Sequence, residues 1–106
     1  MGKPKDYTYV EGVGLFQSRA SAVIYDHFRD SQQDGVTEPI EWTRLRDVLF
    51  GPIGFMEHDD YVLFEIEVIN PSLAEIHKRT GQFIQVELLD NAPDGTERIR
   101  FAQRAD

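Results

Sequence analysis

Residues 61–69 read Tyr-Val-Leu-Phe-Glu-Ile-Glu-Val-Ile, the most regularly patterned run in the chain. Its apolar positions Val62, Phe64, Ile66 and Val68 alternate with a second set that includes Glu65 and Glu67. A period of two residues is typical of a β-strand with one buried face and one face in water. The pattern therefore predicts a strand over 61–69, and the remaining elements are expected to pack against it.

The next segment has the signals of a helix. Asn70 suits the N-cap, and Pro71 suits the first helical position, where no backbone donor is needed. Gly81 suits the C-terminus, since it accepts a left-handed backbone conformation. The apolar face of this predicted helix would consist of Leu73, Ile76, His77 and Thr80.

Two further strands are predicted over 82–89, Gln-Phe-Ile-Gln-Val-Glu-Leu-Leu, and 97–101, Glu-Arg-Ile-Arg-Phe, with turn residues between them. An antiparallel hairpin would bring Arg98 and Arg100 near Glu87 and Gln85 on its outer face. On its inner face we expect one shared core with the first strand. That core would consist of Phe64, Ile66, Ile84, Val86, Ile99 and Phe101.

The N-terminal half is expected to begin with a strand near 7–10, followed by a bulge or close backbone approach at Gly12 and Gly14. Apolar residues at helical spacing predict a helix over 19–33, with Ser18 as its N-cap. Residues 36–42 fit either an extended segment or a helix opened by Pro39. The extended reading is preferred, with a helix from about Thr43 to Gly51.

These elements predict a two-layer α+β domain. We expect a three- to four-stranded, mostly antiparallel sheet with about three helices packed mainly on one face. Helices on both faces are the alternative, which the charged residues of the strands disfavour. Residues 1–106 are expected to form a single domain with a flexible segment over 1–6.

The net charge of the chain is −8, and it is unevenly distributed. Residues 34–67 hold nine acids against two arginines, a balance of −7. Such a field disfavours direct binding to nucleic acid or anionic membranes and favours basic protein surfaces. The chain lacks cysteine, has no apolar run near the ~18 residues of a membrane span and starts without a signal-peptide pattern. A cytoplasmic location is expected.

Candidate catalytic groups are few. Gly12-Val13-Gly14 lacks the third small residue of a dinucleotide-binding loop. His27, His58 and His77 each have a neighbouring carboxylate, but neighbours in sequence usually point apart, and no metal-binding spacing links the three histidines. Glu65 and Glu67 would share a strand face, where Arg98 and Arg100 are expected to neutralise them. We therefore expect no enzyme activity, no cofactor and no metal.

The loop Phe50-Gly-Pro-Ile-Gly-Phe-Met56 combines large apolar residues with glycines and proline, and acids flank it. An apolar centre with a charged rim is typical of protein interfaces. The predicted partner-binding residues are Asp47, Ile53, Phe55, Met56, Glu57, Asp59 and Asp60. Asp59 and Asp60 are expected to lie in an exposed turn, so that their replacement by lysine would leave folding intact. In the alternative reading, the loop folds back as a lid over the core.

The sequence thus favours a small acidic, non-enzymatic protein-binding module. Its expected partner is a basic surface of a nucleic-acid-handling protein, as for a phage-encoded antagonist or an immunity-type protein. Charge and size carry this hypothesis. A homo-oligomeric structural or assembly protein, including a homodimer, is the first alternative. A small ligand-binding or catalytic domain is the second.

Overall fold

A computed structural model describes residues 8–10, 12–51, 60–91 and 97–104. Its elements, in chain order, are β1 (Thr8–Val10), β2 (Gly14–Phe16), α1 (Arg19–Ser31), β3 (Ile40–Glu41), α2 (Trp42–Phe50), α4 (Tyr61–Phe64), the π-helical segment η2 (Glu65–Ile69), α5 (Asn70–Thr80), β4 (Ile84–Asn91) and β5 (Glu97–Gln103). Strands β3, β5 and β4 form an antiparallel sheet in that order, and β1 and β2 form a separate hairpin.

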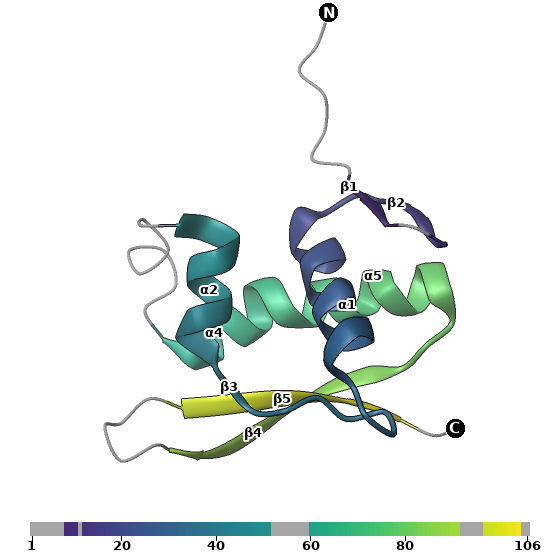
Figure 1. Ribbon diagram of the computed structural model, residues 1–106. Coiled ribbons are helices and arrows are strands. Elements are labelled where there is room, and N and C mark those ends of the chain that lie inside the picture. The colour runs from purple at the N-terminus through teal and green to yellow at the C-terminus, as the bar shows by residue number, and fades with distance from the viewer. Residues whose placement is uncertain (1–7, 11, 52–59, 92–96, 105–106) are drawn as a thin grey trace, which may run out of the picture.

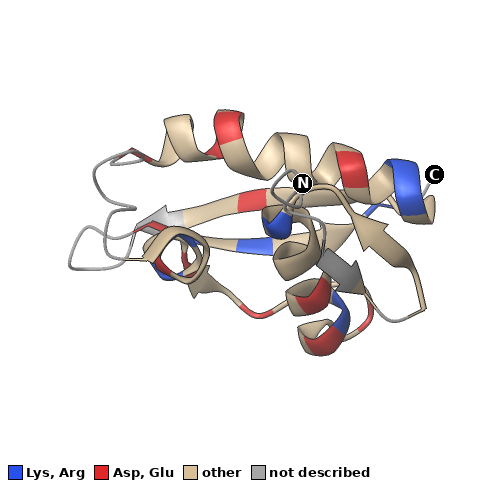
Figure 2. Cartoon of the chain, turned by 90° about the horizontal axis from the view of Figure 1, so that it is seen from above, with Lys and Arg blue, Asp and Glu red and all other residues tan. Residues whose placement is uncertain are grey.

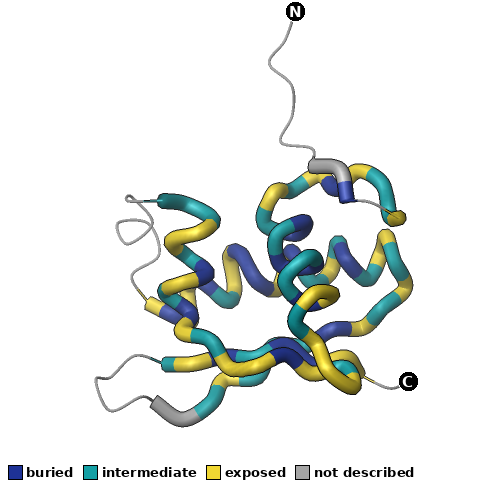
Figure 3. Tube along the Cα trace, in the orientation of Figure 1, coloured by how far each residue is buried: buried dark blue, intermediate teal, exposed yellow. Residues whose placement is uncertain are grey.

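The helices lie together on one side of the sheet (Figure 1). Most of the buried residues lie between these two layers (Figure 3). The central strand β5 contributes Ile99 and Phe101, both 0% exposed, and the helices contribute Ile24, Phe64 and other apolar residues. The predicted two-layer α+β domain with a mostly antiparallel sheet is confirmed.

The prediction of a strand over 61–69 is wrong. Segments α4, η2 and α5 follow one another without a break, so residues 61–80 form one continuous helix. Asp60, rather than Asn70, is its N-cap, and Asn70 itself has helical backbone angles. The predicted end at Gly81 is confirmed, with a φ of 78° in the left-handed region.

The spacing of the buried residues in 61–69 is that of a helix. Tyr61, Phe64 and Val68 are buried at a spacing of three and four residues, which places them on one helical face. Ile69, the neighbour of Val68, is buried as well, so the buried face is broad. Both residues lie in the π turn over Glu65–Ile69.

Pro71 lies inside this helix. Proline has no N–H and its ring presses on the preceding turn, so a regular α-helix is destabilised there. The π turn immediately before it relaxes that conflict, with the Asn70 N–H bonded to the Glu65 carbonyl. Pro71 was predicted to begin a helix, yet it lies within one.

The change from strand to helix moves Ile66 out of the predicted core. Ile66 is 60% exposed, so a charged residue at this position would be in contact with water and is not expected to unfold the domain. Of the other five residues predicted to share the core, Phe64, Ile84, Ile99 and Phe101 are buried, and Val86 packs against them while partly buried.

The N-terminal elements largely follow the prediction. The Ser18 hydroxyl accepts hydrogen bonds from the Ala20 N–H at 3.1 Å and the Ser21 N–H at 3.4 Å, as expected of an N-cap, and α1 ends at Ser31. Gly12 and Gly14 have φ values of 85° and 118° in a hairpin turn. Among the described residues beyond their chain neighbours, no atom lies within 4 Å of where a Cβ would be at either glycine, so the described part of the chain shows no close backbone approach there.

The ambiguous segment 36–42 ends in the short strand β3, which agrees with the preferred extended reading. Helix α2 begins at Trp42, one residue before Thr43, and its cap position Glu41 makes no side-chain cap hydrogen bond. It ends at Phe50, and its C-cap Gly51 has a φ of 68°.

Two arginines, Arg98 and Arg100, were expected to lie near Glu87 and Gln85 of β4 on the outer face of the hairpin. Arg100 does so. Arg100 Nε donates to Glu87 Oε1 at 2.6 Å, and this bond, followed by one from Gln85, lowers the pKa of Glu87. Arg98 instead lies opposite Glu41 of β3. The sheet therefore pairs Arg98 with a different strand from the one predicted.

A pair of substitutions separates the observed helix from the predicted strand. A strand would place Phe64 and Ile66 on the same face, whereas the helix buries the first and exposes the second. Phe64→Ala should lower the free energy of unfolding by about 3–5 kcal/mol through loss of core packing. Ile66→Ala should change it by less than about 0.5 kcal/mol. Urea denaturation monitored by Trp42 fluorescence measures both, and equal losses would contradict the helix.

Candidate functional site

The predicted partner-binding set falls largely outside the described residues. Ile53, Phe55, Met56, Glu57 and Asp59 all lie in the range 52–59, which the structure does not describe. The choice between an exposed loop and a core lid thus stays a prediction. Asp47 and Asp60 are the two members of the set that the structure places.

Asp60 has a structural role that the sequence reading did not assign to it. Its side chain accepts a hydrogen bond from the Leu63 N–H at 3.3 Å, which caps the first turn of the long helix. A carboxylate at this position also interacts favourably with the helix dipole. The expectation that lysine at position 60 leaves folding intact is therefore replaced by a loss of stability.

Asp47 is a surface carboxylate on α2, with 60% of its side chain exposed. Arg46 Nε lies 3.2 Å from its Oδ1, and the guanidinium of Arg46 also lies over the Trp42 ring at 5.2 Å. The Arg46 side chain is only 13% exposed, so water reaches this ion pair mainly from the Asp47 side. Asp47 is thus available at the surface with its charge partly balanced by a neighbour.

The outer side of α4 and η2 carries an exposed apolar group. Val62, Leu63 and Ile66 are 58%, 37% and 60% exposed. Val62 and Ile66 are four residues apart, so they lie about one turn apart on the same side of the helix, with Leu63 beside them. Large apolar residues gathered at the surface mark candidate interaction sites.

Acidic residues flank this apolar group. Asp60 precedes it, and Glu65 and Glu67 lie on the two sides of Ile66 along the chain. We name the set Asp60, Val62, Leu63, Glu65, Ile66 and Glu67 the α4 face. Figure 2 shows acidic positions along this helix at the edge of the molecule.

The α4 face has a rigid support. The Trp42 ring contacts Tyr61 edge-to-face with centroids 5.9 Å apart and Phe64 at 5.4 Å. Trp42 Nε1 donates to Glu97 Oε1 at 3.1 Å, which connects this cluster to β5. Burial of the Tyr61 hydroxyl and the nearby Glu65 carboxylate raise the pKa of Tyr61, so it stays neutral.

Sequence reasoning missed the α4 face because Val62 and Ile66 were assigned to a buried strand face. The available signal was the spacing of Tyr61, Phe64 and Val68, which fits a helix and leaves Val62 and Ile66 outside. The predicted pairing of Glu65 and Glu67 with Arg98 and Arg100 also fails, because that strand face does not exist.

The histidines do not form a common site in the described residues. His27 contacts the Phe101 ring edge-to-face at 6.0 Å, and His77 stacks on Phe83 at 3.7 Å. His58 lies outside the described residues. Across the residues that the structure describes, no group of three or more His, Asp and Glu side chains is placed to hold a metal ion.

No protein-family model matches this chain, and neither the curated proteins nor the solved structures contain a match. Within the described ranges, no helix is both long enough and apolar enough to cross a bilayer.

His27 makes stability depend on pH. Its Nε2 is buried with no hydrogen-bond partner among the described residues, and burial lowers the pKa of His27 from the ordinary value of 6.5, against a smaller opposing effect of Asp30. The unfolded chain then binds this proton more tightly than the folded chain. The stabilisation is complete above pH 6.5 and is lost as the pH falls through 6.5 toward the folded-state pKa.

We expect the urea midpoint of the wild type to fall between about pH 7.5 and 5.5 because of this linkage. His27→Gln should flatten that part of the profile, whereas His77→Gln, the matched control, should keep it. Identical slopes for wild type and His27→Gln would contradict the assignment.

The cap at Asp60 gives a separate stability prediction. Asp60→Ala should lower the free energy of unfolding by about 1 kcal/mol, since the Leu63 N–H loses its acceptor. Asp60→Asn should retain most of the stability, because asparagine caps helices nearly as well as aspartate. Thermal denaturation compares the two, and equal loss in both variants would argue against a capping role.

Proposed function

We propose that this protein is a non-enzymatic binding module that docks through the α4 face on a basic surface of a partner protein. The supporting observation is the exposed apolar group Val62, Leu63 and Ile66 on a rigid helix, bordered by three carboxylates. An apolar centre supplies affinity when it is desolvated, and the charged border selects the partner.

The negative charge of the chain supports a partner with a positively charged surface. The α4 face lies within the segment 34–67, which carries −7 of the net −8. Electrostatic attraction would therefore speed association with a cationic surface and oppose anionic ones. Asp47 on α2 extends the acidic character beyond the long helix.

Nucleic-acid-handling proteins are the partner class that this chemistry fits best, since their working surfaces are rich in lysine and arginine. An acidic module seated on such a surface would block access of nucleic acid. The proposed role is accordingly an inhibitor or regulator. The proposal places it in the cytoplasm, together with such partners.

Self-association is the alternative role. Two copies meeting through the α4 face would bury the same apolar group, but Asp60, Glu65 and Glu67 of both copies would approach one another. Like charges at an interface disfavour that arrangement. A partner of opposite charge is therefore preferred over a second copy.

The test begins with a pull-down using the wild type and continues with binding kinetics on the recovered partner. Asp47→Asn combined with Asp60→Asn removes two charges and keeps the cap, so the on-rate should fall several-fold at low salt. Raising the salt past physiological strength, where the Debye length is about 8 Å, should reduce the difference.

The apolar centre is tested in the same assay. Val62→Ala combined with Ile66→Ala should raise the off-rate about tenfold or more if these side chains anchor the contact. Leu15→Ala on β2, where Leu15 is 52% exposed, is the control and should leave the kinetics unchanged. Equal kinetics for wild type and both α4-face variants would reject the proposal, and recovery of the protein itself as sole partner would favour the homo-oligomer.

A further inference from the structure

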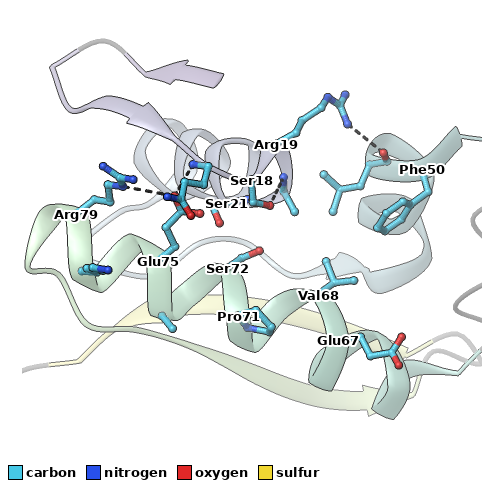
Figure 4. A pocket seen from close by; sticks show the side chains of 15 residues that line it. Ser18, Arg19, Ser21, Phe50, Glu67, Val68, Pro71, Ser72, Glu75 and Arg79 are labelled. Carbon is cyan, nitrogen blue, oxygen red and sulfur yellow. Dashed lines mark hydrogen bonds and ion pairs between the residues drawn. The ribbon is translucent and has the colours of Figure 1, made fainter. Parts of the chain in front are cut away.

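A second candidate site, this one concave, lies on the helical layer, away from the sheet. It is an open cleft of about 640 Å³ between the start of α1, the end of α2 and the η2–α5 helix (Figure 4). Ligand-binding clefts commonly have volumes of this order. Its walls come from three segments far apart in the sequence, near residues 17–21, 49–50 and 67–79.

The floor of the cleft holds a polar group without a partner. Ser21 is 1% exposed, and its Oγ makes no hydrogen bond to any residue that the structure describes. Ser72 of α5, 3% exposed, lines the floor with it (Figure 4). Buried polar atoms are usually satisfied in folded proteins, so the Ser21 hydroxyl indicates a place for a ligand atom that accepts or donates a hydrogen bond.

The protein already places an anionic group here. Glu75 Oε2 accepts a hydrogen bond from the Gln17 N–H at 2.6 Å and lies 3.5 Å from Arg79 Nε. The N-terminal end of α1 adds a favourable dipole for negative charge. These donors together form a carboxylate-binding arrangement, which an internal side chain occupies.

Among the described residues, three cationic side chains line the cleft. Arg19, Lys78 and Arg79 line the cleft against Glu67 and Glu75, an excess of positive charge in a chain of net charge −8. Arg19 donates to the Leu49 carbonyl at 3.0 Å, which holds the end of α2 at the cleft. The side chains that line the cleft thus carry a net positive charge, whereas the chain as a whole is negatively charged.

The remaining wall is apolar. Leu49 and Phe50 line it from α2, and Val68 and Pro71 line it from the long helix, at and just after the π turn. The volume also exceeds what an inorganic anion needs. These features fit a ligand with one charged group and an apolar body.

We propose that this cleft binds a small organic anion, a carboxylate or phosphate ester with an apolar body, whose charged group replaces the Glu75 carboxylate. The ligand anion would accept hydrogen bonds from the Gln17 N–H and the Ser21 hydroxyl and pair with Arg79. Glu75 would rotate toward solvent. Its carboxylate acts as an internal competitor that keeps the site closed to weakly bound anions.

Titration of the isotope-labelled protein with benzoate and with phenyl phosphate, followed by NMR, tests the site. We expect saturable shifts of the Gln17, Ser21 and Ser72 amides with dissociation constants of about 1 mM. The better of the two probes identifies the preferred charged group. Benzamide, a neutral analogue of benzoate, should bind at least about tenfold more weakly.

Two variants test the role of the charges. Glu75→Gln should raise the affinity about fivefold or more because the competing charge is lost, whereas Arg79→Gln should lower it by a similar factor. Glu38→Gln, at an exposed position away from the cleft, changes the net charge equally and should have little effect. No saturable shift in either wild type or Glu75→Gln at about 20 mM probe would overturn the proposal. Equal gains in Glu75→Gln and Glu38→Gln would overturn it as well.

Discussion

The packing of Trp42 against the first turn of the 61–80 helix is the interaction on which the rest of the structure depends. Trp42 is 4% exposed and contacts Tyr61 and Phe64, and its indole N–H is bonded to Glu97 of β5. It therefore joins α2, the long helix and the sheet at one point. Once Phe64 faces inward there, helix geometry requires Val62 and Ile66 to face outward.

The π turn lies immediately before Pro71. Helix 61–80 buries Phe64 and Val68 before this proline and Ile76 after it. Proline lacks the N–H donor and its ring presses on the preceding turn, so a regular α-helix is destabilised there. The wider turn over Glu65–Ile69 relaxes that conflict, and Val68 and Ser72 line the cleft beside it.

The sequence was sufficient for the fold class and for the elements with unambiguous end signals, such as α1 after Ser18 and the helix end at Gly81. It was misleading at 61–69, because Val62, Phe64, Ile66 and Val68 match a two-residue period while Tyr61, Phe64 and Val68 match a helical one. β-branched residues favoured the strand, and Pro71 has a standard place at a helix start. Packing around Trp42, which is a tertiary contact, decides between them.

The candidate sites were less predictable than the fold. The sequence alone shows that acidic residues are concentrated in 34–67. The apolar centre of the binding surface was predicted in the loop 50–56, whereas the described residues expose an apolar group on α4. The cleft could not be found from sequence, since the contact between Gln17 and Glu75 joins residues 58 positions apart. Such contacts follow from how α1 packs on α5, and no local pattern encodes them.

Backbone NMR of residues 61–69 is the most direct test of this account. A continuous helix predicts downfield Cα shifts and strong sequential amide–amide contacts from Tyr61 to Thr80, without interruption at Asn70 and Pro71 other than the missing proline amide. Upfield Cα shifts over 61–69, with strong Hα-to-amide contacts and cross-strand contacts to β4 or β5, would show a strand. That result would contradict the exposed α4 face and the function proposed from it.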